Sequence, residues 1–253
     1  MNRIVKWLKH KLERVVLLDD VVVDNLSLKI VERHYRVFFK STRSIEDSFG
    51  GWLSGIYIDK KECHQPFLSK IQQLILQWSK ASEPKNAIVF GCAGCSIPRF
   101  LYLSYPRCKT VGIELKPQLI SIARKYFEIE SYNNFKLVQY DALKYFEIFP
   151  PTYEKFDLQI VDLFNGPILE SRVFSEQFLS KLLESASDRS ITIFNLHKNC
   201  IDLRSINLSK IGFKSVLLYS KRRYHLICIK SKDSEMHFMQ YITRNYRVIN
   251  QDE

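Results

Sequence analysis

Long runs of apolar residues are absent from this 253-residue sequence. Its apolar runs, such as Val21–Val23 and Leu74–Leu76, are far shorter than the roughly 20 residues that a membrane-spanning helix needs. No segment repeats at a fixed period, which excludes a solenoid. Apolar residues still make up 46% of the chain and charged residues 26%. The composition is therefore that of a globular protein with a sizeable core, and not that of a disordered or collagen-like chain.

Cysteine is also sparse, with six residues in the chain. They are Cys63, Cys92, Cys95, Cys108, Cys200 and Cys228. This number is too low for a disulfide-stapled secreted scaffold, so we infer a reducing compartment. Met1–Leu18 lacks the clean apolar stretch and the small-residue cleavage site of a secretory signal peptide. We therefore expect a cytoplasmic protein without a transmembrane segment.

Basic residues outnumber acidic ones, which gives a formal net charge of +11 and a pI of about 9.3. A basic surface favours anionic partners such as nucleic acid, an anionic membrane face or an acidic ligand. The basic residues are dispersed, however, and no long block of lysine and arginine occurs. We interpret the charge as a solvated surface and do not expect a nucleic acid partner.

The first third of the chain divides into two parts. Apolar residues at helical spacing, from Ile4 to Val15, predict a basic helix over residues 1–20 that either packs on the body of the protein or contacts an anionic membrane. Residues 21–60 contain strand-like patterns, for example at Tyr35–Lys40. Pro66 then opens an apolar helix. We predict a small β-strand unit with a linking helix over residues 21–80.

From residue 81 onward, strand and helix patterns alternate. The strands lack clean polar and apolar alternation, which indicates a parallel sheet covered on both faces. The predicted strands are 87–90, 110–114, 135–139, 156–161, 190–195, 213–219 and 224–230. Only Ser220–Arg223 separates the last two, too few residues for a parallel crossover, so they should form a hairpin. The predicted fold is α/β: a Rossmann-like, seven-stranded, mostly parallel sheet ending in an antiparallel hairpin over residues 81–232, followed by a tail over 233–253.

Residues that can carry chemistry follow four successive predicted strands. The first strand ends in a turn with two glycines, Gly91 and Gly94, which lets the backbone approach a ligand closely. Glu114 follows the second strand, Asp141 the third and Asp162 the fourth. Because ligands of open α/β sheets bind at the carboxyl ends of the strands, this edge is the predicted site. Taken singly, each residue also has a purely structural interpretation, as part of a tight turn, as an acid at a helix start or as a helix cap.

The segments around these residues resemble the spermidine synthase, or polyamine aminopropyltransferase, family, within the class I S-adenosylmethionine-dependent methyltransferase-like fold. They are Ala87–Gly94, Val111–Glu114, Tyr140–Leu143, Phe156–Asp162 and Val173–Phe178. The resemblance covers roughly residues 27–230, nearly the whole chain. A small strand-rich unit ahead of a histidine-containing helix start also fits the family's N-terminal domain.

The resemblance implies aminopropyl transfer from an adenosyl sulfonium co-substrate to a small-molecule amine or polyamine. The co-substrate is decarboxylated S-adenosylmethionine, or S-adenosylmethionine itself, and no metal is implied because the sulfonium carbon is already electrophilic. The implied adenosyl-binding residues are Gly91, Gly94, Glu114, Asp141 and Ala142, with Glu114 on the ribose and Asp141 on the adenine. Asp162 matches the acid that serves the attacking amine and is the implied catalytic residue. A homodimer is compatible with the sequence.

The acceptor side of the implied site departs from the family pattern. The family's glycine loop carries an aspartate where this chain has Gly94, and the segment that usually reads tyrosine, then histidine or glutamine, then glutamate is here Cys63, His64 and Gln65. The acid normally three residues past the catalytic one is Asn165. His64, Gln65 and Asn165 are thus the implied substrate-binding residues, in a pocket with fewer carboxylates to attract a dication.

The sequence is also compatible with two functions other than aminopropyl transfer. A methyltransferase on the same fold would use ordinary S-adenosylmethionine, and a non-catalytic homologue would keep the adenosyl pocket without turnover. The N-terminal strand unit favours the aminopropyltransferase over the methyltransferase. The missing acids favour the non-catalytic homologue over a true spermidine synthase.

Two further signals lie at the same edge of the predicted sheet. Cys92 and Cys95 form one CxxC pair inside the glycine loop, and without a second ligand pair zinc is not expected there. A reactive thiol at the helix start is the other interpretation of this pair, because a helix N-terminus lowers a thiol pKa. His197 follows the fifth predicted strand, where it either faces the pocket or makes ordinary polar contacts.

Overall fold

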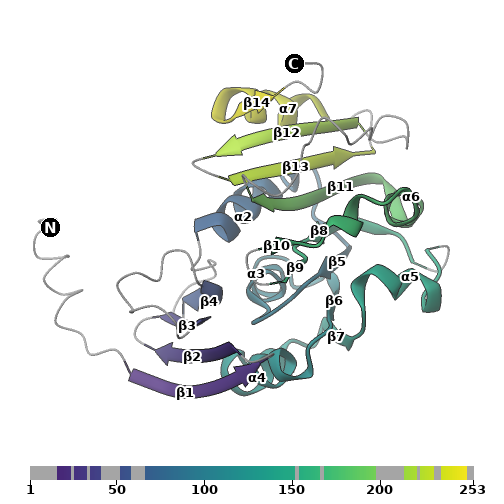
Figure 1. The fold of residues 1–253 in the computed structure, drawn as a ribbon. Helices are drawn as coiled ribbons and strands as arrows, with labels where there is room; N and C mark the ends of the chain where they lie inside the picture. The colour runs from purple at the N-terminus through teal and green to yellow at the C-terminus, as the bar shows by residue number, and fades with distance from the viewer. Residues whose placement is uncertain are drawn as a thin grey trace, which may run out of the picture.

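The computed structural model describes residues 16–23, 26–32, 35–40, 52–57, 66–151, 154–165, 168–197, 214–220, 223–230 and 235–249. Its larger part is built on an eight-stranded sheet with the strand order β14-β12-β13-β11-β8-β5-β6-β7 (Figure 1). The parallel strands are β5 (Asn86–Phe90), β6 (Lys109–Glu114), β7 (Phe135–Gln139), β8 (Phe156–Val161) and β11 (Ala186–His197). The antiparallel strands at one edge are β12 (Lys214–Ser220), β13 (Arg223–Ile229) and β14 (Arg247–Ile249). The predicted Rossmann-like α/β sheet is therefore confirmed.

All seven predicted strands occur in this sheet, and the expected hairpin is formed by β12 and β13. The prediction of seven strands is wrong by one, because β14 adds an eighth. β14 pairs with β12 over only three residues, Leu217–Tyr219, which is too short for a strand pattern to be seen in the sequence. The predicted C-terminal tail is also wrong over its middle part, since α7 (Glu235–Asn245) precedes β14. Phe238, Ile242 and Tyr246 are buried at helical spacing there.

Helices cover both faces of the sheet and bury two apolar clusters. One cluster lies under α2 (Pro66–Trp78), α3 (Ser96–Ser104), α4 (Pro117–Phe127) and α7. The other lies under α5 (Tyr145–Ile148), α6 (Glu176–Ser185) and two short 3-10 helices, Ala142–Lys144 and Ser171–Phe174. Successive residues of β5 divide between the clusters, with Val89 in the first and Phe90 in the second. A strand buried on both faces explains why polar and apolar residues do not alternate in its sequence.

A four-stranded antiparallel sheet precedes α2, with the order β1-β2-β3-β4. Its strands are β1 (Val16–Val23), β2 (Leu26–Glu32), β3 (Tyr35–Lys40) and β4 (Trp52–Tyr57). Leu28 and Ile30 of β2 belong to the same buried cluster as α3 and α4. Asp19 of β1 accepts hydrogen bonds from Lys125 and Tyr126 of α4. These contacts attach the small sheet to the larger unit.

The predicted N-terminal helix is wrong over residues 16–20, which belong to β1, and its remainder lies outside the described residues. The valines of β1, Val21, Val22 and Val23, favour an extended strand over a helix. The helix predicted to open at Pro66 is confirmed as α2. The domain boundaries placed at residues 20, 80 and 232 stay predictions. Within the described part of the chain, no helix has both the length and the apolar character that crossing a membrane would require.

Candidate active site

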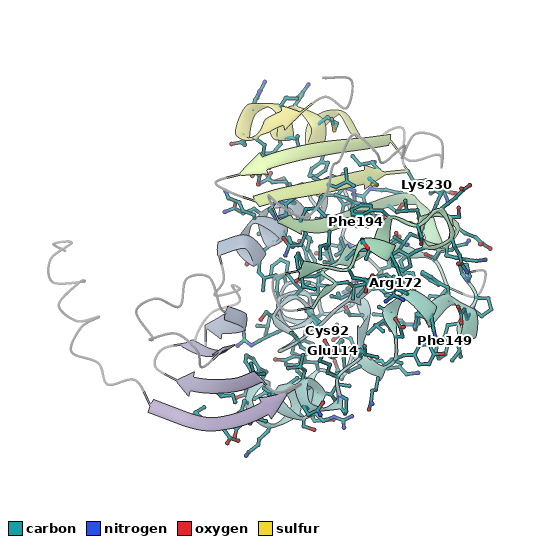
Figure 2. The ribbon with its side chains drawn as sticks, viewed as in Figure 1. Cys92, Glu114, Phe149, Arg172, Phe194 and Lys230 are labelled. Carbon is teal, nitrogen blue, oxygen red and sulfur yellow. The ribbon has the colours of Figure 1, made fainter. Side chains whose placement is uncertain are left out.

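The carboxyl ends of the parallel strands are joined by hydrogen bonds that continue just beyond the strands themselves. They run from Gly91 N to Ile113 O (2.9 Å), from Asp162 N to Phe90 O (2.9 Å) and from Tyr140 N to Glu114 O (3.1 Å). The backbone thus brings the glycine turn, Glu114, the segment before Asp141, and Asp162 to one edge of the sheet. This is the clustering that the sequence predicts. Figure 2 shows Glu114 next to Cys92 of the glycine turn.

The glycine turn needs Gly91 for two separate reasons. Gly91 has a φ of +84°, and a Cβ built on it would lie 2.3 Å from the carbonyl oxygen of Asp162. Only glycine tolerates both the left-handed conformation and this close approach. Ala93 (φ 44°) and Cys95 (φ 58°) also lie in the left-handed region. Gly94 is buried and is not among the positive-φ residues of the described chain, so the backbone strain falls on its neighbours.

Glu114 fastens the glycine turn to the end of β6. Its side chain is only 7% exposed. Oε2 accepts a hydrogen bond from Ala93 N at 2.8 Å, and Oε1 accepts one from Lys116 N at 3.1 Å. A carboxylate offers about four acceptor positions, so these two bonds leave capacity for two more donors. The structure therefore supports the role of an acid at a helix start, and it also leaves the carboxylate able to accept from a diol.

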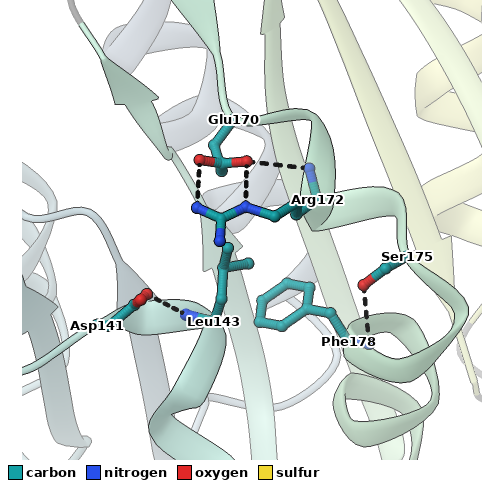
Figure 3. Close-up of polar contacts among 6 residues, drawn as sticks. All are labelled: Asp141, Leu143, Glu170, Arg172, Ser175 and Phe178. Carbon is teal, nitrogen blue, oxygen red and sulfur yellow. Dashed lines mark hydrogen bonds and ion pairs between the residues drawn. The ribbon is translucent and has the colours of Figure 1, made fainter.

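Asp141 caps the short 3-10 helix that begins at Ala142. Its Oδ1 accepts a hydrogen bond from Leu143 N at 3.0 Å (Figure 3), so the capping interpretation is confirmed. Oδ2 forms no hydrogen bond within the described residues, and the side chain is half-buried. Ala142 is buried in the second apolar cluster. A capped carboxylate with one oxygen left over still has an acceptor for a ligand donor.

Asp162 follows β8 directly and is half-buried. Its Oδ1 accepts a hydrogen bond from Asn195 Nδ2 at 2.8 Å. The next element is a two-stranded hairpin of β9 (Phe164–Asn165) and β10 (Ile168–Leu169), so the helix-cap interpretation of Asp162 is wrong. Asp162 therefore stands at the sheet edge with its carboxylate oriented by a neighbouring strand.

The predicted acceptor residues are described only in part. His64 and Gln65 lie outside the described residues, as does Cys63. Asn165 is placed in β9, opposite Ile168, but nothing is described of its side chain. His197 is the last residue of β11 rather than part of a following loop. The roles assigned to these residues stay predictions.

Comparison with known proteins gives partial relatives. No protein-family model matches the chain. The polyamine aminopropyltransferase of Chromobacterium violaceum is 27% identical over 131 residues, which are 48% of this chain and 49% of that protein. The eEF1A lysine and N-terminal methyltransferase of Mus musculus is 27% identical over 148 residues, which are 55% of this chain and 21% of that protein. The chain thus spans about half or less of the length of these curated relatives.

A solved structure matches nearly the whole chain. A probable spermidine synthase from Corynebacterium glutamicum superposes with a TM-score of 0.71 over 94% of this chain and 92% of that one, at 14% sequence identity. The chain has the spermidine synthase fold. The predicted resemblance is confirmed at the level of fold, and the low identity carries no further information about activity.

An ion pair near Asp141 at the carboxyl ends of the parallel strands is not predicted by the sequence. Arg172 donates to both carboxylate oxygens of Glu170, at 2.8 Å each (Figure 3). The guanidinium holds the pKa of Glu170 at about 2. Asp141 also raises the pKa of Arg172, although less than Glu170 does. Glu170 is the N-cap of a short 3-10 helix, and residues two apart do not form the side-chain pairs that a helical pattern predicts, so helix periodicity did not reveal this ion pair.

Leu115, directly after Glu114, was also missed. It is 58% exposed and is one of four large apolar residues that are exposed in the described part of the chain. Single exposed apolar side chains are common on protein surfaces, so Leu115 is of interest only because it directly follows Glu114. Its place directly after a strand-end acid is the only sequence signal that points to it.

The two cysteines of the turn are free and buried. Burial raises the pKa of the Cys92 thiol well above its ordinary value, and the nearby Cys95 raises it further. A thiol nucleophile must be ionised to react. Cys92 is therefore poorly suited to be the reactive thiol, and the interpretation of Cys95, which precedes α3, stays a prediction. Cys92 fills the space that Gly112 leaves open: a Cβ on Gly112 would lie 2.6 Å from Cys92 Sγ.

Proposed function

We propose that the chain is a transferase that binds an adenosyl sulfonium donor at the ends of β5, β6 and β7 and transfers an aminopropyl group to an amine held at Asp162. The observation that carries this proposal is the position of Glu114. A nearly buried carboxylate fastened to the glycine turn, with acceptor capacity left over, is suited to a ribose diol. The names of the partial relatives, an aminopropyltransferase and a methyltransferase, support a transferase with such a donor.

The donor site follows from the residues around Glu114. The glycine turn lets the donor's chain pass close to the backbone. Oδ2 of Asp141 would accept a hydrogen bond from the exocyclic adenine amine, and the exposed Leu115 would pack against the adenine face. Each group gains a partner on binding: an acceptor gains a donor and an apolar surface is removed from water. Decarboxylated S-adenosylmethionine is the proposed donor.

The transfer step places little chemical demand on the protein. The amine nitrogen forms a bond to the propyl carbon attached to the sulfonium, the carbon–sulfur bond breaks, and its electron pair leaves with sulfur as neutral methylthioadenosine. The amine loses one proton, which Asp162 accepts. Catalysis is then largely orientation of an uncharged amine in line with the reactive carbon, together with removal of that proton.

The N-terminal sheet favours aminopropyl transfer over methyl transfer. It precedes α2 as the resemblance implies, and a probable spermidine synthase covers it as part of a 94% match. The methyltransferase alternative rests on the murine relative, which matches a slightly larger part of this chain than the aminopropyltransferase does. The non-catalytic alternative rests on Gly94 and Asn165, which replace acids of the family pattern. We further propose a small amine or polyamine as acceptor, no nucleic acid partner, a cytoplasmic location, and a homodimer.

Donor binding is tested by thermal unfolding with methylthioadenosine. A ligand present at 100 times its Kd stabilises the native state by roughly 2.7 kcal/mol, which corresponds to a rise in Tm of about 5–10 °C for a chain of this size. Glu114→Gln should lose most of this rise, because an amide has one acceptor oxygen where the carboxylate has two. Glu147→Gln, at an exposed carboxylate of α5, is the matched control and should keep it. If no adenosyl compound shifts the Tm at millimolar concentration, the donor site is absent.

The transfer step is tested at Asp162. Asp162→Asn is nearly isosteric and should keep the methylthioadenosine shift, since Glu114 and Asp141 hold the nucleoside. Turnover should fall by roughly 10²–10⁴-fold, the usual contribution of a general base. Equal turnover by wild type and variant would remove Asp162 as the base. Binding of methylthioadenosine without turnover of any amine by wild type would favour the non-catalytic homologue.

A further inference from the structure

A row of polar side chains crosses three neighbouring strands beneath the proposed acceptor position. Asp162 follows β8, Asn195 lies in β11 and His225 lies in β13. β11 is paired with β8 on one side and β13 on the other, and Asn195 is directly opposite His225 in the antiparallel register. Residues directly opposite each other on adjacent strands have Cβ atoms about 4.5–5.5 Å apart. The side chains of Asn195 and His225 are therefore neighbours.

This row is buried in apolar surroundings. Asn195 and His225 are each 1% exposed. The next cross-strand pair on the same face is Ile193 of β11 and Ile227 of β13. Both residues belong to the first apolar cluster. A polar side chain placed among such residues destabilises the fold unless its hydrogen bonds are formed. We therefore expect Asn195 and His225 to have a function that apolar side chains at these positions could not perform.

Asn195 has one of its two polar groups engaged. Nδ2 donates to Asp162 Oδ1 at 2.8 Å, which fixes which end of the amide is the nitrogen, because a carboxylate oxygen must accept. Oδ1 is buried and has no hydrogen-bond partner in the described part of the chain. An unsatisfied buried acceptor of this kind calls for a donor. The side chain that the register places opposite it is an imidazole, which always carries at least one N–H.

We propose that Asn195 and His225 are positioning residues for Asp162. When the donor site is filled, an N–H of His225 would donate to Asn195 Oδ1 and fix the amide plane. The amide NH₂ would then hold Oδ1 of Asp162 so that the carboxylate presents Oδ2 to the acceptor amine. This assignment rests on the proposed function of Asp162. Hydrogen bonds of catalytic groups are often long without ligand and tighten in the complex, so the imidazole-to-amide bond is expected to close when the donor site is filled.

Substitutions at the two positions separate positioning from folding. Asn195→Leu removes the amide donor, and His225→Phe removes the imidazole N–H while keeping a ring of similar size. A carboxylate displaced by about 1 Å loses roughly 10²-fold in rate, so kcat should fall by up to about 10²-fold for Asn195→Leu and less for His225→Phe. The donor KM should change little. His225→Gln, which keeps an N–H donor, should restore kcat, and Ile227→Val on the same face of β13 is the control for a small loss of stability with kcat unchanged.

A spectroscopic readout tests the same row without turnover. The side-chain NH₂ resonances of Asn195 are identified as the pair missing from Asn195→Leu, in the free protein and with methylthioadenosine. They should shift in His225→Phe and stay near their wild-type positions in His225→Gln and Ile227→Val. If the wild-type protein turns over no amine, the proposed function is wrong. The shifts of the Asn195 side-chain NH₂ resonances still show whether His225 contacts Asn195. Unmoved resonances in His225→Phe, or a kcat for His225→Phe equal to that of Ile227→Val, would overturn the inference.

Discussion

A single methyl group added at Gly91 should disturb both the fold and the position of Asp162. Gly91→Ala places a Cβ where the backbone has a φ of +84°, and that Cβ would lie 2.3 Å from the carbonyl oxygen of Asp162 and 2.9 Å from its carbonyl carbon. Ordinary contacts of this kind are about 3.5–4.0 Å, so the two segments must separate by more than about 1 Å. The hydrogen bond from Asp162 N to Phe90 O, 2.9 Å long, resists that separation.

The size of the effect can be estimated from its two causes. A left-handed conformation costs a residue with a Cβ roughly 1–2 kcal/mol, and forcing extra volume into a packed site costs about 1–3 kcal/mol. Together they predict a loss of about 2–5 kcal/mol in the free energy of unfolding. For a chain of this length the Tm should fall by about 5–20 °C. Turnover should fall further, by roughly 10²-fold, if Asp162 is displaced by about 1 Å.

Thermal unfolding and amine turnover of Gly91→Ala measure these two effects. Gly94→Ala is the matched control, since Gly94 lies in the same turn but is not among the positive-φ residues of the described chain. The control should lose less stability than Gly91→Ala. A Gly91→Ala protein that melts within about 2 °C of wild type, less than 1 kcal/mol by this conversion, would refute the argument that close approach and left-handed backbone make this glycine necessary.

Three further predictions follow from individual contacts. Gly112→Ala should lower the Tm, because its Cβ would lie 2.6 Å from Cys92 Sγ, and the added change Cys92→Ala should restore part of the loss. Cys92 should resist alkylation in the native protein, as followed by mass spectrometry, because burial raises its pKa. Arg172 lowers the pKa of Glu170 from an ordinary 4.5 to about 2, so this solvent-screened pair should add a small amount of stability at neutral pH. Arg172→Gln should be less stable at pH 6, and the difference should vanish as the pH falls from about 4.5 towards 2; a difference that grew at low pH would have the wrong sign.

The fold could be predicted where buried elements produce a recognisable pattern of apolar residues in the sequence. The inner parallel strands, such as β5 and β8, are buried along almost their whole length and are rich in apolar residues, whereas the edge strand β7 is only partly buried. The short gap at Ser220–Arg223 predicted the hairpin. The prediction failed at the chain ends. β14 is an edge strand of three residues, too short to show the two-residue alternation of a β-strand. β1 begins within the segment that was predicted to be a helix. At α7 the buried residues do recur at helical spacing, and that signal was overlooked.

The candidate site divides in the same way. Gly91, Glu114, Asp141 and Asp162 could be predicted because they follow strands, and strand ends of a parallel sheet meet at one edge. Asn195 could not, because it lies inside β11 and reaches Asp162 across the sheet, a contact set by register rather than by sequence spacing. The general rule locates an edge of the sheet. It does not say which neighbouring side chains hold the acids that stand there.

The most direct test of the account is the identity of the product. Wild-type protein is incubated with decarboxylated or ordinary S-adenosylmethionine and a panel of amines, and the products are identified by mass spectrometry, with Asp162→Asn and Glu147→Gln in parallel. The account predicts methylthioadenosine together with an aminopropylated amine, formed from the decarboxylated donor by wild type and Glu147→Gln and strongly reduced in Asp162→Asn. A methylated product formed from ordinary S-adenosylmethionine, with no aminopropyl transfer to any amine, would contradict it.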